Sequence, residues 1–242
     1  MAGLAALRTG AGLVTVASTE AALPGIAAHA PEIMTELLAA DESTRARLLE
    51  RKNVVAIGPG LGQEPETVQL VRTIVEQTPL PMIVDADGLN ALAGRPTRYR
   101  WPRIFTPHPG EMSRLNGRSI AQIQSDRIGT ARTFAVERGV YLVLKGNRSV
   151  VAAPDGRVWI NPTGSPAMAT GGTGDVLTGM IAGMIAQFPD QVDAALLAAV
   201  WLHGRAGELG AAKLGEKSLI ATDLLEFLPE AMREVANHFH TV

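Results

Sequence analysis

Short runs of β-branched and aliphatic residues alternate along the chain with longer stretches of helical periodicity. The runs predict strands over residues 13–18, 54–58, 82–86, 103–106 and 141–146, and helices over 66–77, 120–137 and most of the chain from 173 onward. The strand runs lack the alternation of apolar and polar residues expected of a sheet with one solvent-exposed face. This favours a sheet that is buried on both faces. This order predicts an α/β fold with a mainly parallel central sheet and helices on both faces.

One stretch departs from the strand–helix alternation. In residues 149–160, SVVAAPDGRVWI, two strand-like runs flank a Pro-Asp-Gly turn. Such a turn between apolar runs is typical of an antiparallel hairpin. We therefore expect a mixed sheet with an added β-hairpin. No linker-like segment divides the chain, so residues 1–242 are expected to form a single domain.

Composition narrows the classes of function. The 242 residues are 46% hydrophobic with a formal net charge of −2, which leaves no overall basic field for nucleic acid. The chain has no cysteine, which excludes disulfides and thiolate zinc sites and favours the cytoplasm. No uninterrupted apolar run approaches the roughly 20 residues of a membrane-spanning helix. We expect small-molecule ligands or other subunits as partners, with no nucleic acid and no membrane.

Four polar or glycine-rich segments follow directly after predicted strands, where open α/β sheets bind ligands. Asn90, about one turn into the helix expected after the second segment, is a candidate substrate-binding residue. All four segments are expected to face one crevice. They are GPGLG at 58–62, DADGLNAL at 85–92, TPHPGEM at 106–112 and KGNRS at 145–149.

A fifth segment, residues 161–183, joins a glycine-rich loop to an apolar helix. Gly171, Gly172 and Gly174 let successive amides turn toward an anion, and the helix expected from Thr173 adds its positive end. Asp175, in the first turn, is either a helix cap or a base that takes a proton from an attacking hydroxyl. Beside these glycines it favours phosphoryl transfer. The spacing matches neither a P-loop nor a dinucleotide fingerprint.

The other polar residues of these segments each have two interpretations. His108, between two prolines, is either structural or a hydrogen-bond partner of a substrate amide or hydroxyl. Glu111 either caps the next helix or helps to hold hydrated metal near phosphates. Asp85 and Asp87 are either a metal pair or a strand-to-helix junction with an Asp cap. Lys145 either meets a phosphate oxygen or is a solvated strand-end lysine.

Taken in order, these motifs resemble the ADP-dependent NAD(P)H-hydrate dehydratases, a branch of the ribokinase-like fold. The likeness spans nearly the whole chain and rests on ALRTGAGLVTVA, GPGLG, DADGLNAL, TPHPGEM, LKGNRSVV and NPTGSPAMATGGTGDVLTGMIAG. It implies dehydration of the (S) form of NAD(P)H hydrate with ADP as co-substrate, releasing NAD(P)H, AMP and phosphate. Asp175 would deprotonate the ring hydroxyl, which then accepts the terminal phosphoryl group of ADP.

The resemblance also implies ligand contacts and an assembly. Mg²⁺ is expected from the phosphate chemistry, with no protein ligand assigned, and a homo-oligomer, often a tetramer, is implied. Ser149 stands where threonine is common. Implied substrate contacts are Gly60, Gly62, His108 and Asp175, and implied nucleotide contacts are Lys145, Gly146, Asn147, Arg148, Ser149, Gly172, Thr173 and Gly174.

Members of this family usually carry an earlier strand and a GGS-type turn before a helix whose end matches MAGLAALRTGAG. We therefore expect the chain to be truncated at its N-terminus relative to the family, without that substrate-contacting turn. Two alternatives stay open: a small-molecule kinase of the same fold, of the thiazole or hydroxymethylpyrimidine type, and a non-catalytic nucleotide-binding subunit. TPHPGE and AMATGGTGD favour the dehydratase over the kinase, and Asp175 argues against the non-catalytic subunit.

Overall fold

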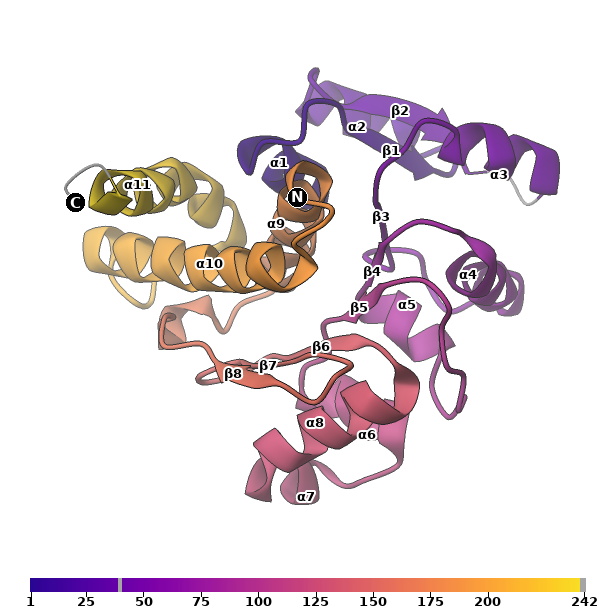
Figure 1. Ribbon diagram of the computed structural model, residues 1–242. Helices are drawn as coiled ribbons and strands as arrows, with labels where there is room; N and C mark the ends of the chain where they lie inside the picture. Colours follow the sequence, from indigo (N-terminus) through magenta and orange to yellow (C-terminus); the bar gives the residue numbers. More distant parts are fainter. Residues whose placement is uncertain (39–40, 240–242) are drawn as a thin grey trace.

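The computed structural model describes residues 1–38 and 41–239, and its larger sheet has six strands in the order β3-β4-β5-β6-β7-β8 (Figure 1). The first four run parallel to one another, while β7 and β8 form the predicted antiparallel hairpin. Each strand predicted for this sheet is confirmed, one or two residues shorter than its expected range. The bounds are β3 Val55–Ile57, β4 Met82–Val84, β5 Arg103–Phe105, β6 Tyr141–Leu144, β7 Val150–Ala152 and β8 Val158–Ile160.

Successive residues of these strands pack into two different hydrophobic cores. Met82 and Val84 of β4 join a core with α4–α8, and Ile83 between them joins a core with α1 and α9–α11. This is the period of two expected of a pleated strand, and Figure 1 shows the two helical layers on opposite sides of the sheet. Burial on both faces is therefore confirmed. The first layer comprises α4 Pro65–Gln77, α5 Ala86–Ala91, α6 Pro109–Asn116, α7 Ile120–Ser125 and α8 Arg127–Arg138; the second comprises α1 Ala2–Arg8, α9 Thr173–Gln187, α10 Val192–Leu214 and α11 Ala221–Phe239.

The predicted strand near residue 15 is present but pairs elsewhere. β1 (Thr15–Ser18) pairs in parallel with β2 (Met34–Leu37) across α2 (Leu23–His29), and α3 (Glu42–Leu49) follows. Within the described residues this pair is a separate two-stranded sheet, at the top of Figure 1. We did not expect β2, because MTEL carries only one β-branched residue.

Two details of the helices differ from the pattern-based expectation. The helix predicted over 120–137 is interrupted at Asp126, whose backbone leaves the helical region and whose carboxylate caps α8 through the Gly129 N–H. A short 3₁₀ turn, Pro166–Met168, precedes α9. No helix in the described part of the chain is long and apolar enough to cross a membrane.

Candidate active site

The predicted loops converge where β4, β5 and β6 end. The Lys145 N–H, just after β6, donates to the Pro107 carbonyl, just after β5, at 2.8 Å. The Lys145 ammonium lies 2.8 Å from Oδ1 of Asp85, just after β4, and 3.8 Å from Glu111 of the TPHPGE segment. These three segments therefore lie together at one edge of the sheet.

Asp85 is the buried anion of the site, with 1% of its surface exposed. Its second oxygen, Oδ2, accepts a hydrogen bond from the Thr178 hydroxyl of α9 at 2.9 Å. The carboxylate therefore neither caps α5 nor pairs with Asp87, whose own Oδ2 accepts from the Gly62 N–H at 3.0 Å. Asp85 does occupy the N-cap position of α5 directly after β4, as the junction interpretation predicts, but its side chain makes no capping hydrogen bond. The two aspartate side chains bind different segments.

Asp175 and Lys145 lie beside the first turn of α9. A Cβ atom on Gly174 would sit 3.1 Å from Lys145 Nζ and 3.5 Å from Asp85 Oδ2, so the first turn of α9 passes close to both side chains. Asp175 is half-buried, and burial raises the pKa of its carboxyl group above the ordinary value. The negative charge of Asp85 adds to this rise. The arrangement combines a basic carboxylate with an ammonium and a helix N-terminus, which suits transfer of a charged phosphoryl group.

The glycine-rich turn before α9 is held by hydrogen bonds within the motif and by one from α10. Gly172 has a φ of 90°, which favours glycine, and the Thr173 hydroxyl donates to the carbonyls of Met168 and Thr170 at 3.0 and 3.1 Å. Nε2 of His203, on α10, lies 2.9 Å from the Thr173 carbonyl and donates to it. His203 was not predicted from the sequence; its only signal is a polar ring directly after the apolar run of residues 194–202 in α10.

His108 and Glu111 form a capping box at the start of α6. Nδ1 of His108 accepts from the N–H groups of Gly110 and Glu111 at 3.0 and 3.4 Å, and Glu111 Oε2 accepts from the His108 N–H at 2.8 Å. The helix-cap interpretation of Glu111 is confirmed. An accepting Nδ1 leaves the proton of a neutral imidazole on Nε2. Nε2 of the exposed His108 ring lies 3.5 Å from Glu111 Oε1 and is the nitrogen that would donate to a ligand.

The GPGLG loop is tied to the helix that carries Asn90. Besides the bond from Gly62 to Asp87, the Asn90 amide lies 3.4 Å from Asp87, and Asn90 Oδ1 accepts from Arg114 Nε at 2.8 Å. Gly60 has a φ of 72°. Asn90 thus stabilises the α5–α6 contact through Arg114, a partner that the sequence analysis missed.

The loop over residues 145–149 connects β6 to β7. Ser149 Oγ donates to the Gly146 carbonyl at 3.3 Å, and Arg148 has a φ of 51°. Asn147 and Arg148 are exposed. The loop therefore presents its backbone at the same sheet edge as Lys145.

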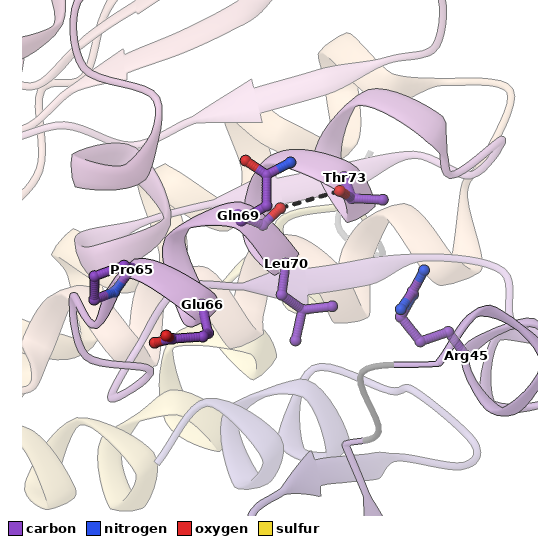
Figure 2. Close-up of a pocket in the computed structure, with 6 residues that line it drawn as sticks. All are labelled: Arg45, Pro65, Glu66, Gln69, Leu70 and Thr73. Atoms are coloured by element: carbon purple, nitrogen blue, oxygen red, sulfur yellow. Dashed lines mark hydrogen bonds between the residues drawn. The ribbon is translucent and has the colours of Figure 1, made fainter.

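The described residues form no metal cage at this edge. Within residues 1–38 and 41–239, no group of three or more His, Asp or Glu side chains is placed to hold a metal ion. A cavity of about 520 Å³ lies instead between α3 and α4 (Figure 2). It contains none of the predicted site residues; its lining is Arg45, Pro65, Glu66, Gln69, Leu70 and Thr73.

Comparison with known proteins agrees with this architecture. Residues 1–230 match the NAD(P)H-hydrate dehydratase family. The bifunctional NAD(P)H-hydrate repair enzyme of Moorella thermoacetica is 45% identical over 254 residues, covering 100% of this chain and 48% of that protein. The ADP-dependent (S)-NAD(P)H-hydrate dehydratase of Bacillus subtilis is 40% identical, covering 96% of this chain and 83% of that protein.

A solved structure shows the same fold. The ADP/ATP-dependent NAD(P)H-hydrate dehydratase from B. subtilis, co-crystallised with ATP/Mg²⁺, superposes with a TM-score of 0.87 at 39% identity, covering 96% of this chain and 83% of that one. The ribokinase-like α/β fold is thereby confirmed. The chain spans about half the length of the bifunctional relatives that it matches. Its sequence match and its architecture agree, and the chain belongs to the NAD(P)H-hydrate dehydratase family.

Proposed function

We propose that the chain catalyses ADP-dependent dehydration of the (S) form of NAD(P)H hydrate, regenerating NAD(P)H with release of AMP and phosphate. The observation that carries this proposal is the meeting of Asp175, Lys145 and the N-terminus of α9 at one sheet edge. The names of the relatives support it, since the B. subtilis protein is an ADP-dependent (S)-NAD(P)H-hydrate dehydratase.

The reaction follows as a phosphoryl transfer and an elimination. Asp175 takes the proton of the ring hydroxyl, whose oxygen bonds to the terminal phosphorus of ADP while the bond to the AMP oxygen breaks. Phosphate then departs with the carbon–oxygen electron pair, pushed by the lone pair of the ring nitrogen. Loss of a proton from the neighbouring carbon restores the dihydropyridine, so the balance is loss of one water and hydrolysis of ADP.

The other residues bind the two ligands in this proposal. Lys145 neutralises phosphoryl oxygens from its place against Gly174. His108 donates from Nε2 to the nicotinamide amide. The proposed substrate contacts are Gly60, Gly62, Asn90, His108 and Asp175, and the proposed nucleotide contacts are Lys145, Gly146, Asn147, Arg148, Ser149, Gly172, Thr173 and Gly174.

Mg²⁺ fits this site as an ion carried by the nucleotide. Asp85 already binds Lys145 and Thr178, and the described residues offer no cluster of three metal ligands. Magnesium retains several waters and often binds through substrate phosphates, with one or two carboxylates nearby. Besides Asp85, the carboxylates near the site are Asp175 and Glu111. The ion would reduce the negative charge of the transferring phosphoryl group.

Replacing Asp175 with Asn tests the base assignment. We expect D175N to lose turnover of hydrated NADH by about 10²-fold or more, because it cannot accept the proton, while ADP affinity by calorimetry changes little. Recovery of dihydronicotinamide absorbance is the assay. A mutant that keeps most of its rate would remove Asp175 as the base. A stable phosphorylated product instead of NADH would support the kinase, and ADP binding without any turnover would support a non-catalytic subunit.

The raised pKa of Asp175 predicts how the rate and the melting temperature depend on pH. Only the ionised carboxylate accepts a proton, so the wild-type rate should fall as pH is lowered through a pKa above the ordinary carboxyl range. The same rise means that ionisation opposes folding. D175N should therefore melt at a higher temperature than wild type at pH 7, and this gain should vanish below the ordinary carboxyl range.

The remaining parts of the proposal concern the whole protein. We propose that residues 1–242 form one catalytic domain, that it assembles as a homo-oligomer, with a tetramer as the working hypothesis, and that it acts in the cytoplasm. The exposed apolar side chains of Leu214 and Ile220 support a subunit contact near the end of α10. The cysteine-free composition suits a reducing compartment. Light scattering of the purified protein tests the assembly.

A further inference from the structure

Arg127 connects the first turn of α8 to the loop that follows β6. Asp126 caps this helix by accepting from the Gly129 N–H at 2.8 Å, which makes Arg127 the first residue of α8. The guanidinium then reaches the loop backbone. Nη2 donates to the Leu144 carbonyl at 3.0 Å and to the Lys145 carbonyl at 3.4 Å, and Nη1 donates to the Asn147 carbonyl.

These bonds orient the peptide planes of the loop. In a trans peptide the C=O of one residue points opposite to the N–H of the next. Holding the Lys145 and Asn147 carbonyls on one cation therefore turns the N–H groups of Gly146 and Arg148 away from it. In the described part of the chain, the amides of Gly146, Asn147 and Arg148 donate to no protein acceptor. The loop thus offers donors to a ligand that supplies acceptors.

Gly146 fits the same arrangement. Its φ is 144°, in the region that favours glycine, and a Cβ at this position would lie 3.0 Å from Nη2 of Arg127. A side chain here would therefore strain the loop and push the guanidinium from its carbonyl acceptors. The positive φ favours glycine in the KGN motif, and the close guanidinium leaves little room for a side chain there.

The buried position of Arg127 is energetically unfavourable for its guanidinium. Its Nε is buried and has no hydrogen-bond partner in the described part of the structure. Burial also lowers the pKa of the guanidinium, although an arginine remains charged at neutral pH. An unpaired buried donor is uncommon, and the three carbonyl bonds offset it.

We propose that Arg127 is the positioning residue of the nucleotide site: it holds the loop over residues 145–149 with the Gly146 and Arg148 amides facing a nucleoside diphosphate. The inference rests on the proposed function for the identity of this ligand. Arg127 itself acts through the loop and has no contact with the reacting atoms.

Calorimetry with ADP and with AMP tests the proposal on R127A and R127K, with R132A as the matched control. Arg132 lies on the same helix and is exposed. We expect R127A to weaken ADP and AMP binding and to raise KM for ADP about tenfold or more, with kcat nearly unchanged, because several charge-assisted bonds are lost. R127K, with fewer donors, should fall between wild type and R127A. Added guanidinium ion at low concentration should restore part of the R127A affinity.

The outcomes are separable. Wild-type-like ADP binding by R127A, or equal weakening by R132A, overturns the positioning role while the proposed function stands. If R127A does not fold, unaltered ADP affinity of R127K overturns it. If wild type binds neither ADP nor AMP, the proposed function fails. Amide hydrogen exchange then decides the positioning role, since faster exchange of residues 146–149 in R127K than in R132A supports it and equal exchange overturns it.

Discussion

Asp85 joins three segments that lie far apart in the chain. Its two oxygens bind Lys145 and Thr178, which are 60 and 93 residues away, and the side chain is almost fully buried. A buried carboxylate is costly unless its oxygens are paired. Here the pairing holds the Lys145 ammonium beside Gly174 and places a negative charge near Asp175. One side chain therefore sets the position of the cation and contributes to the basicity of the proposed base.

Asp85→Asn should change both the stability of the fold and the pH dependence of the rate, and the two can be measured separately. The amide keeps the shape but loses the charge, so the free energy of unfolding should fall by about 3 kcal/mol, measured by urea denaturation. The acid limb of the rate profile should move to lower pH, because the negative charge that raises the Asp175 pKa is gone. Asp190→Asn, at an exposed carboxylate, is the control. An unchanged acid limb would contradict the electrostatic role.

Arg103 connects β5 to the end of α4. It is fully buried, and its guanidinium donates to the carbonyls of Val75, Thr78 and Leu80 at 2.7 to 2.8 Å. Helix α4 ends without a glycine cap, so this cation satisfies carbonyls that a helix end leaves unpaired. Burial lowers the pKa of Arg103 to about 10, which leaves it charged at neutral pH.

Arg103→Met should therefore remove about 3 kcal/mol or more from the free energy of unfolding, because several buried carbonyls lose their donor. Urea denaturation of Arg103→Lys should show a smaller loss, since the ammonium keeps the charge with fewer donors. Arg100→Met tests the alternative that loss of a cation near Trp101 is responsible, as Arg100 is exposed and also lies over that ring. Equal losses from the two methionine variants would refute the carbonyl argument.

Two helical layers cover the six-stranded sheet, apart from the separate β1–β2 sheet, and the site lies where elements of both layers meet. Helix α9 approaches α1 closely because it carries glycines: a Cβ on Gly179 would lie 2.0 Å from the Ala2 carbonyl oxygen. His203 of α10 packs behind the α9 turn, and burial lowers the pKa of its imidazole to about 4. The neutral ring therefore depends on the packed layer around it.

The lowered pKa of His203 predicts that the folded protein loses stability as pH falls. In the unfolded chain His203 is protonated near the ordinary pKa of 6.5, whereas in the folded protein it stays neutral down to about pH 4. Stability contributed by the neutral ring should therefore be lost as pH falls from about 6.5 to 4. Melting temperatures should show a smaller acid loss in His203→Gln than in wild type, whereas His29→Gln, at an exposed site, should follow wild type. Parallel curves for wild type and His203→Gln would exclude this contribution.

The sequence by itself determined the strands of the larger sheet, the hairpin and the segments that carry the site, because apolar periodicity and turn residues are local signals. The glycines before α9 and the capping box at His108 belong to this class. The sequence did not predict β2 or the break at Asp126. Only the tertiary structure decided that Asp85 binds Lys145 and Thr178, that Arg127 holds the loop after β6, and that β1 pairs with β2. These partners are brought together by packing between distant segments, and no local pattern encodes such distances.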